Sequence, residues 1–465
     1  MADPKTNKAA KDIESELYKK REKIYPREVH GIFATLRNLA MVALLGFFYV
    51  LPWIQYDGHQ SILFDLPARK FYIFGWTFWP QDFIYLTALL LIAAYALFFF
   101  TALAGRLWCG YACPQTVWTE IFIWIERKFE GSRQKQMKLD KGPWNGERIM
   151  RTGGKHLTWA LFSLYTGFTF VGWFTPINTL FSDIMIGDIS AWGIFWILFY
   201  AFATYGLAGM MREQVCIYMC PYARFQSVMF DKDTLLIAYD EDRGEPRGAR
   251  KKNTDTSELG DCINCGLCVQ VCPTGIDIRD GLQYQCIGCA ACIDVCDEVM
   301  EKVNQPKGLV RYTTEESLKG GETRIFRPRI MVYAALLIAI TGALFYSIAT
   351  RIPLEVDIIR DRNALYIEND EGLIENVYTL KVINMTNQQQ KYRLSVGGIE
   401  GLALKMRDEL IVVESGAVTE VPIRLEADPN SLKAAGTNVE FTVESTVTDG
   451  LSLTETGRFL GPVNR

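Results

Sequence analysis

The chain has 465 residues, of which 49% are hydrophobic and 22% are charged. This composition excludes a disordered chain and a uniformly membrane-embedded one, and the length allows several domains. The formal net charge of −4 argues against nucleic acid as a partner.

The charged segment 1–31 precedes the first apolar stretch, and we predict that it is a cytoplasmic arm. No small-residue cleavage site follows that stretch, so we expect a retained anchor rather than a cleaved signal. A membrane-spanning helix needs about 20 mostly apolar residues. The third candidate is shorter and rich in threonine and aromatic residues, and a buried core helix is its alternative interpretation. The five predicted spans are Ile32–Pro52, Phe83–Ala104, Leu157–Phe174, Ile189–Met211 and Ile330–Ala349.

The number of lysine and arginine residues alternates between high and low in the successive segments outside these spans. Residues 1–31 carry eight and residues 105–156 carry ten, whereas 53–82 carry two and 175–188 carry none. The positive-inside rule then places the N-terminus in the cytoplasm and, after five spans, the C-terminus outside. We therefore predict a multi-pass protein of the bacterial inner membrane with a periplasmic C-terminal domain.

The membrane core, predicted over 32–239, contains a weak internal repeat. In each half a two-span hairpin ends in a Cys-x3-Cys-Pro motif, which gives Cys109, Cys113 and Pro114, then Cys216, Cys220 and Pro221. On a helix, positions i and i+4 share a face, and proline suits the first turn of a following helix. Thiolates select soft ions such as Cu(I), or a cluster iron, so four thiolates from two helix ends are a candidate metal site. A redox-active dithiol and simple packing of small apolar cysteines remain open.

Two further features accompany these motifs. Arg106 and Arg212 stand before them, either to pair with thiolates or as ordinary positive-inside anchors. The stretch that begins at Pro114 has apolar and charged residues at helical spacing. It predicts an amphipathic helix on the inner membrane surface, or a plain surface helix of the cytoplasmic part.

A charged linker over 240–258 leads to a ferredoxin module over 259–300. Its two runs have the Cys-x2-Cys-x2-Cys-x3-Cys spacing of bacterial ferredoxins, in which the fourth cysteine ligates the neighbouring cluster. This spacing disfavours structural zinc. The predicted ligands of two [4Fe–4S] clusters are Cys262, Cys265, Cys268 and Cys296 for the first, and Cys286, Cys289, Cys292 and Cys272 for the second.

All twelve cysteines belong to these four groups and fall on the predicted cytoplasmic side. Thiols there are kept reduced, which favours metal or cluster ligation over structural disulfides. The second ferredoxin run ends in Cys296-Asp297 rather than Cys-Pro. The extra carboxylate is expected to lower the potential of the nearby cluster.

A polar connector over 301–329 leads to the fifth span, 330–349. From 354 to 465, short β-prone runs alternate with Gly, Asn and Asp turns. This spacing predicts an external immunoglobulin-like β-sandwich without the Ig disulfide, with an isolated barrel as the alternative. The expected fold is therefore an α-helical membrane bundle with a two-cluster ferredoxin-like insert and a C-terminal sandwich.

The long motifs GRLWCGYACPQTVW, CIYMCPYARFQSVMFD and DCINCGLCVQVCPTGIDIRDGLQYQCIGCAACIDVCDEVM resemble the cytochrome c oxidase accessory proteins of the CcoG type, also called FixG or RdxA. The resemblance covers nearly the whole chain beyond the first thirty residues. It implies a role in assembling cbb3-type oxidase as a cupric reductase, with Cys109, Cys113, Cys216 and Cys220 as the copper-handling thiols and copper bound only transiently.

The resemblance leaves alternatives open. One alternative function is a quinol-linked membrane ferredoxin subunit, and another is a redox sensor or assembly scaffold without turnover. Expected partners are oxidase assembly factors or copper carriers, an electron donor that the sequence does not name, and a second copy of the chain in a homodimer.

Overall fold

The computed structural model describes residues 23–56, 58–250, 259–386, 388–432 and 434–462. The predicted arm therefore lies mostly outside the described residues, as does the second half of the predicted linker. The chain divides into two compact units. The first contains 1–51, 93–172 and 177–337, and the second contains 52–92, 173–176 and 338–465.

Among the residues that the structure describes, four helical stretches are long and apolar enough to cross a membrane, and they coincide with four of the five predicted spans. Apolar side chains point outward from them, as on Phe83 (64% exposed) and Leu90 (61%). Large exposed apolar surfaces of this kind mark contact with lipid or a partner, and the chain is a membrane protein. The stretches are Ile32–Trp53, Pro80–Ala104, Ala191–Met211 and Pro328–Ala349, formed mainly by α2 (Ile32–Val50), α3 (Phe83–Ala104), α9 (Ala191–Thr204) and α15 (Pro328–Ala349).

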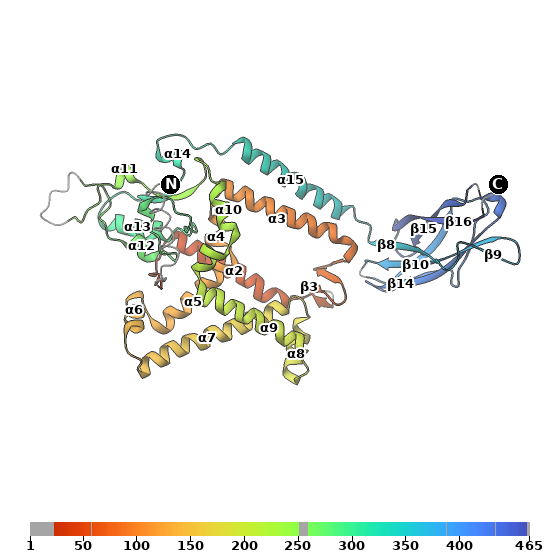
Figure 1. Cartoon of the computed structure of the whole chain (residues 1–465), viewed down its shortest axis with the longest axis horizontal. Helices are drawn as coiled ribbons and strands as arrows, with labels where there is room; N and C mark the ends of the chain where they lie inside the picture. Colours follow the sequence, from red (N-terminus) through yellow and green to blue (C-terminus); the bar gives the residue numbers. More distant parts are fainter. Residues whose placement is uncertain (1–22, 57, 251–258, 387, 433, 463–465) are drawn as a thin grey trace, which may run out of the picture. The chain divides into compact units, whose positions relative to one another are not determined.

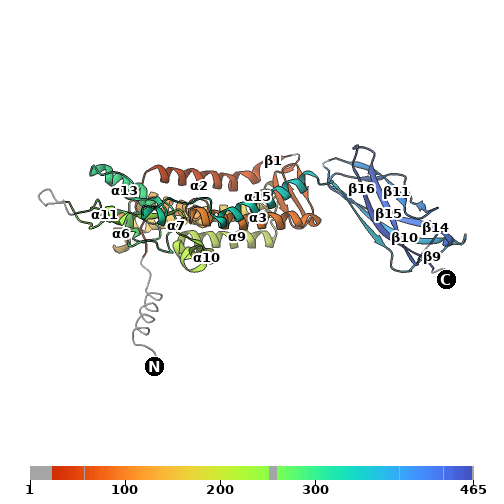
Figure 2. The same cartoon turned by 90° about the horizontal axis from the view of Figure 1, so that it is seen from above.

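The third predicted span forms the second half of α7 (Gly146–Val171), whose first half is charged. Helix α7 packs along α9 and also contacts α5 (Pro114–Glu130), as Figures 1 and 2 show. Leu157, Leu161 and Leu164 point outward and are 63%, 59% and 43% exposed. Helix α7 is not among the four stretches above, so its crossing of the membrane stays a prediction.

Helix α5 is the amphipathic helix that the sequence predicted after Pro114. Its apolar face is buried against α7 and the π-helical turn η3 (Tyr205–Met211), with Phe122 in contact distance of Trp159. The helix is therefore an integral part of the bundle. A π-helical turn widens the backbone, and such turns occur frequently at functional sites; this one directly precedes the second cysteine motif.

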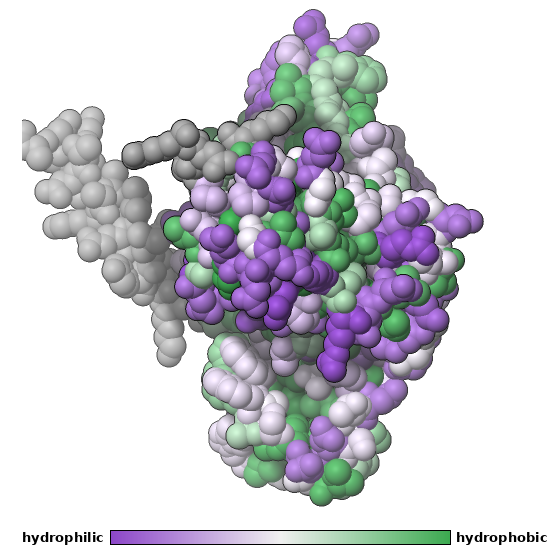
Figure 3. Space-filling model, turned by 90° about the vertical axis from the view of Figure 1, so that its right-hand side faces the viewer, coloured by the Kyte–Doolittle hydropathy of each residue, from purple (hydrophilic) through white to green (hydrophobic). Residues whose placement is uncertain are grey.

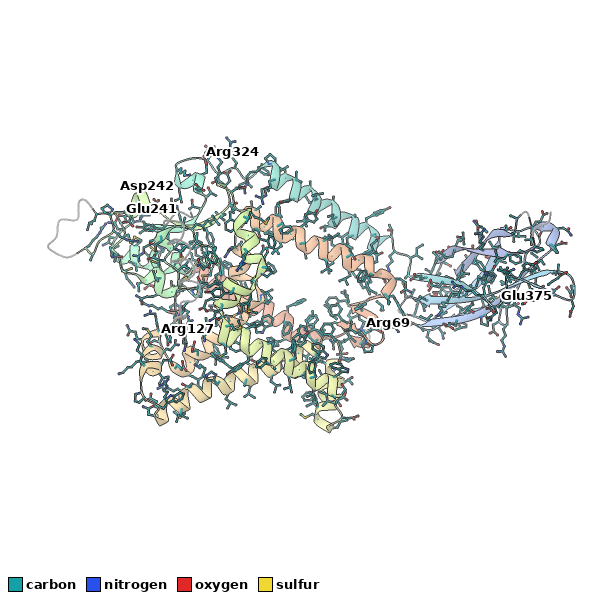
Figure 4. All side chains as sticks on the ribbon, in the orientation of Figure 1. Arg69, Arg127, Glu241, Asp242, Arg324 and Glu375 are labelled. Atoms are coloured by element: carbon teal, nitrogen blue, oxygen red, sulfur yellow. The ribbon has the colours of Figure 1, made fainter. Side chains whose placement is uncertain are left out.

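The ferredoxin part is bracketed by a two-stranded ribbon that the sequence did not predict. Strand β6 (Leu236–Tyr239) precedes the cysteine runs, and β7 (Val310–Thr313) follows them and pairs with it antiparallel. Between them lie α12 (Leu267–Val271) and α13 (Ala291–Lys302). Helix α11 (Glu241–Gly244) follows β6, and its exposed Glu241 and Asp242 lie at the outer edge of this part (Figure 4).

Helix α2 begins directly on the ferredoxin part. The Asp294 carboxylate of α13 accepts hydrogen bonds from the backbone N–H groups of Phe33 (3.2 Å) and Ala34 (2.7 Å). A carboxylate at this end satisfies unpaired N–H groups and complements the helix dipole. One membrane helix is thus fixed to the cysteine-bearing loops.

The second unit contains the predicted β-sandwich. Its core is made of alternating inward residues such as Tyr378, Leu380, Phe441 and Phe459, which are fully buried. The sandwich faces the viewer in Figure 3, where hydrophilic side chains predominate. One sheet has the order β12 (Ala403–Lys405), β14 (Val418–Ala427), β10 (Ile374–Asn384) and β8 (Leu354–Arg360), with β9 (Ile367–Glu368) on β10, and the other β13 (Ile411–Val413), β11 (Gln390–Gly397), β15 (Gly436–Ser445) and β16 (Ser452–Leu460).

The same unit includes the loop between the first two spans, which forms a small sheet that the sequence did not predict. Its strands are β3 (Ile62–Asp65), β4 (Lys70–Ile73) and β5 (Trp76–Phe78). The loop packs on the sandwich. The Lys70 ammonium donates to the Gly416 carbonyl (2.7 Å), and Trp79 is buried in a cluster with Ile383 and Met385.

Candidate metal centres

The two ferredoxin runs surround two small cavities, each with four cysteines of the predicted set. One cavity, of about 20 Å³, is lined by Cys272, Cys286, Cys289 and Cys292, which we call the Cys289 cage. The remaining walls are mostly aliphatic, and only Thr274 adds a polar side chain. The turns that shape this cage have Gly288 and Ala290 in the left-handed region, at φ 67° and 59°.

The second cavity is also about 20 Å³ and is lined by Cys262, Cys265, Cys268 and Cys296, the Cys262 cage. Apolar residues of α13 and β7 and the side chains of Tyr239 and Arg279 complete the wall. Cys268 lines both cavities, so the two cages are immediate neighbours.

The donor set in each cage fits an iron–sulfur cluster. A [4Fe–4S] cluster takes four cysteine thiolates in an apolar shell, and each cage offers four sulfurs, one from the other run, as the crossed pattern predicts. Within the described parts of the chain, no three His, Cys, Asp or Glu side chains come close enough to bind a single metal ion. Since a cubane presents its irons at separate corners, its ligands stand further apart than those of one ion.

The four remaining cysteines form a third group, the thiol quartet: Cys109, Cys113, Cys216 and Cys220. All four cysteines are partly buried. The two motifs interact electrostatically, because Cys113 and Cys109 of the first motif, together with Cys220, raise the pKa of Cys216 in the second. The two halves of the internal repeat therefore meet within one chain. The Cys109 thiol also donates to the buried Gln226 Oε1 (3.4 Å), a residue for which the sequence carried no signal.

The expectation that each pair lies on one continuous helix is wrong. Cys109 lies in α4 (Leu107–Tyr111), but Cys113 is extended and precedes α5. Likewise Cys216 lies in the π-helical turn η4 (Val215–Met219), and Cys220 is extended before α10 (Pro221–Met229). Pro114 and Pro221 each begin the next helix, as predicted; because proline restricts its preceding residue to extended backbone, the helix has to end between the two cysteines.

Burial raises the pKa of three quartet thiols. Desolvation raises the pKa of Cys109 to about 11 and that of Cys216 to about 12, and neighbouring thiolates add to both shifts. Desolvation also raises the pKa of Cys113, against backbone hydrogen bonds from Thr116 and Gln115 that favour the thiolate. These shifts favour the neutral thiol, so a metal that binds here displaces protons.

Arg106 and Arg212 are not exposed anchors, and the charge of Arg106 favours the thiolate forms of Cys109 and Cys216. The Arg106 guanidinium is buried and donates to three backbone carbonyls, those of Ala223, Tyr284 and Cys286. Arg212 is also buried and forms an ion pair with Glu126 of α5 (2.7 Å). Both arginines therefore fix the backbone around the quartet.

Comparisons with known protein families agree with this division of the chain. Residues 86–131 match a family described as a 4Fe-4S binding domain, and residues 211–315 match a 4Fe-4S dicluster domain. Residues 344–462 match an IG-like fold at the C-terminal of FixG. The chain thus contains two 4Fe–4S binding domains and an Ig-like domain.

Several curated proteins are similar over most of their length. Protein RdxB of Cereibacter sphaeroides is 40% identical and covers 84% of this chain and 85% of its own. Nitrogen fixation protein FixG of Rhizobium meliloti is 36% identical and covers 92% of this chain and 88% of its own. The crystal structure of a FixG-related protein from Vibrio parahaemolyticus is 36% identical, with a TM-score of 0.21, and covers 23% of this chain and 95% of that one. On the matches to the two curated proteins, the chain belongs to the FixG/RdxA family of iron–sulfur electron-transfer proteins.

Proposed function

We propose that this protein reduces Cu(II) to Cu(I) at the thiol quartet, on the cytoplasmic side of the inner membrane. The product would pass to copper carriers or assembly factors of a cbb3-type oxidase. The observation that carries the proposal is the meeting of two soft-ligand pairs, nearly 110 residues apart in sequence, beside the cysteine cages of the ferredoxin part.

The cage cysteines and the quartet cysteines have different roles in this proposal. The eight cysteines of the two cages would hold two [4Fe–4S] clusters, which supply single electrons. Since no three described cysteines come close enough to share one metal ion, the quartet would bind copper through a pair of thiolates. Thiolates prefer Cu(I) to Cu(II) and so favour the reduced product. Each Cu(II) takes up one electron and becomes Cu(I), and a one-electron donor protein replaces that electron.

The proposed membrane topology rests on the ends of α7. Near its start, Lys155 pairs with Glu130 of α5 (2.6 Å), on the side of the quartet. After its end, the Trp173 carbonyl accepts from the N–H of Phe64, in the loop between the first two spans. The quartet also joins Cys109, which follows α3, to Cys216, which follows α9. The end of α3 and the end of α9 therefore lie on the same side of the membrane. The chain has to cross the membrane once between them before α9 begins, and α7 is the helix that can do so. This gives five spans in total and puts the sandwich in the periplasm.

The test of copper reduction uses purified full-length protein with intact clusters. Reduced by dithionite and freed of excess reductant, the wild type should convert Cu(II) to Cu(I), detected with a Cu(I)-specific chelator. Serine at all four quartet positions should lower the initial rate at least tenfold, while iron and sulfide contents stay unchanged.

Met210→Leu is the matched control, since this exposed thioether follows α9 without belonging to the quartet. Its rate should equal that of the wild type. If the four-serine variant kept the wild-type rate, the quartet would not be the copper site.

A second function for the quartet is favoured by one observation. The 4Fe-4S binding match at 86–131 includes only two cysteines, Cys109 and Cys113. The quartet would then hold a further cluster and extend the relay. Anaerobic iron and sulfide analysis separates the two proposals, because the four-serine variant would lose one cluster's iron in this case and none in the copper case.

A further inference from the structure

The quartet touches the Cys289 cage through bare backbone. Gly110, between the first two quartet cysteines, packs against the Gly288–Cys289 peptide. A Cβ atom at Gly110 would lie 2.8 Å from the Gly288 carbonyl oxygen and 2.9 Å from the Cys289 Cα. Both distances are shorter than side-chain carbons tolerate, so only glycine allows this approach.

Arg106 ties the same two loops together. Its guanidinium donates to the Cys286 carbonyl (3.1 Å) and to the Tyr284 carbonyl. In the reverse direction, a Cβ at Gly288 would meet the Arg106 carbonyl oxygen at 3.0 Å. Since Arg106 is only 6% exposed, these hydrogen bonds are shielded from water. The start of the first quartet motif is thus fixed to the loop that carries two ligands of this cage.

The second quartet motif meets the same cage across a larger cavity. This cavity has a volume of about 170 Å³ and is lined by both Cys216 and Cys289. Arg37 of α2 also lines it and donates to the Cys289 carbonyl. Both halves of the quartet therefore face the Cys289 cage.

The Cys262 cage has a different environment. Of the residues that the structure describes, none from the quartet lines its cavity, whose walls come from β7, α12 and α13 and from Tyr239. Cys265 is the exposed cysteine among the twelve, and Asn264 beside it is exposed as well. Cys268 is the shared wall toward the Cys289 cage.

The exposed Cys265, the Cys262 cage, the Cys289 cage and the quartet thus follow one another in space. From this spatial order we infer that electrons flow through the chain in a fixed direction. An external donor protein reduces the Cys262 cage at the exposed Cys265 side, and the Cys289 cage passes electrons to the quartet across the Gly110 contact. The inference rests on the proposed copper reduction. The Cys289 cage would hold the cluster that supplies one electron for each Cu(II) that becomes Cu(I), and the Cys262 cage would hold the cluster that replaces this electron.

The first experiment widens the Gly110 contact. Gly110→Ala puts a methyl group against the Gly288–Cys289 backbone, which cannot rotate away as a side chain could. The quartet therefore has to move away from the Cys289 cage. Pre-reduced protein should then transfer electrons to Cu(II) at least tenfold more slowly, with unchanged iron and sulfide contents. Gly153→Ala on α7 is the control, because a Cβ there meets nothing within 4 Å, and its rate should equal that of the wild type.

The second experiment needs no substitution at the contact and no turnover. Redox titration of the two clusters by EPR is carried out on the wild type with and without Cu(I), whose binding changes the charge at the quartet and therefore the potential of the nearer cluster. Cu(I) should shift one wave and leave the other in place. Cys286→Ser alters only the Cys289 cage. The wave that this substitution displaces or abolishes is therefore the wave of the cluster in the Cys289 cage.

The outcomes separate the inference from the function on which it rests. If the wild type reduces Cu(II), but Cu(I) shifts the Cys262-cage wave or both waves equally, the inferred direction is wrong and copper reduction stands. An undiminished rate in a folded Gly110→Ala variant also overturns the direction. If the wild type fails to reduce Cu(II), the proposed function itself is wrong.

Discussion

Glu126 of α5 is a buried carboxylate that pairs with Arg212, shortly before the second quartet motif. Its side chain is 2% exposed and contacts three cations, with Arg212 at 2.7 Å, Lys23 at 3.2 Å and Lys155 at 3.5 Å. Burial works against the charged carboxylate, but the three cations outweigh it and lower the pKa of Glu126. This carboxylate therefore holds the segment after η3, and with it Cys216, against α5.

Glu126→Gln should consequently destabilise the folded protein. The substitution leaves Arg212 buried without its counter-charge and Lys155 with Glu130 as its remaining partner. Breaking a buried pair typically costs about 3–5 kcal/mol. Thermal unfolding in detergent at pH 7 should show a clearly lower Tm. Glu120→Gln is the control on the same helix, since Glu120 is partly exposed and lies 3.9 Å from Arg127 (labelled in Figure 4); its effect should stay within about 0.5 kcal/mol. Equal Tm values for the two variants would contradict the assigned role.

The same carboxylate predicts a pH dependence. Because its folded-state pKa is lowered, its contribution to stability is complete above the ordinary glutamate pKa of about 4.3 and is lost as the pH falls through the lower folded value. The Tm difference between the wild type and Glu126→Gln should therefore be constant from pH 6 to pH 7 and shrink in acid below about pH 4. A difference that grew in acid would contradict this sign.

At the scale of the elements, α7 and α9 approach each other closely at Gly167. A Cβ there would lie 2.9 Å from the backbone nitrogen of Ala201 and would overlap the Ile197 carbonyl. Small residues permit such backbone approach between membrane helices. Gly167→Ala should force the helices apart at a cost of about 1–3 kcal/mol, measured as a lower Tm and less protein in the membrane fraction.

Gly153→Ala on the same helix provides the comparison. Its Cβ would point into open space, and alanine is the better helix former by about 1 kcal/mol. This variant should be as stable as the wild type or slightly more so. If Gly167→Ala behaved in the same way, the close packing of α7 on α9 would be in doubt.

The elements also show what the sequence can and cannot predict. Apolar length located four spans, and cysteine spacing located both cages, because each signal is local. The helix break between Cys109 and Cys113 was missed, although Pro114 excludes helical backbone at the residue before it. The Gly110 approach and the ion pair between Glu126 and Arg212 depend on segments that lie 86 or more residues apart, and no local pattern encodes them.

For the whole molecule, the proposed five-span topology makes a direct prediction. If α7 crosses the membrane, the turn at Asp188 lies in the periplasm and Gly142, before α7, lies in the cytoplasm. Alkaline phosphatase, which folds only outside the cytoplasm, should be active when fused after Asp188 and inactive when fused after Gly142. Green fluorescent protein should give the reverse pattern. Equal phosphatase activity at both positions would show that α7 does not cross.

The packing of the loop between the first two spans on the sandwich has a consequence for biosynthesis. Trp79 is made about 300 residues before its partners Ile383 and Met385. At about 5–20 residues per second, the ribosome needs about 15–60 s to reach them. During that time the indole lacks its hydrophobic partners, and the small sheet lacks its support. The loop therefore reaches its final packing only after the sandwich has been made.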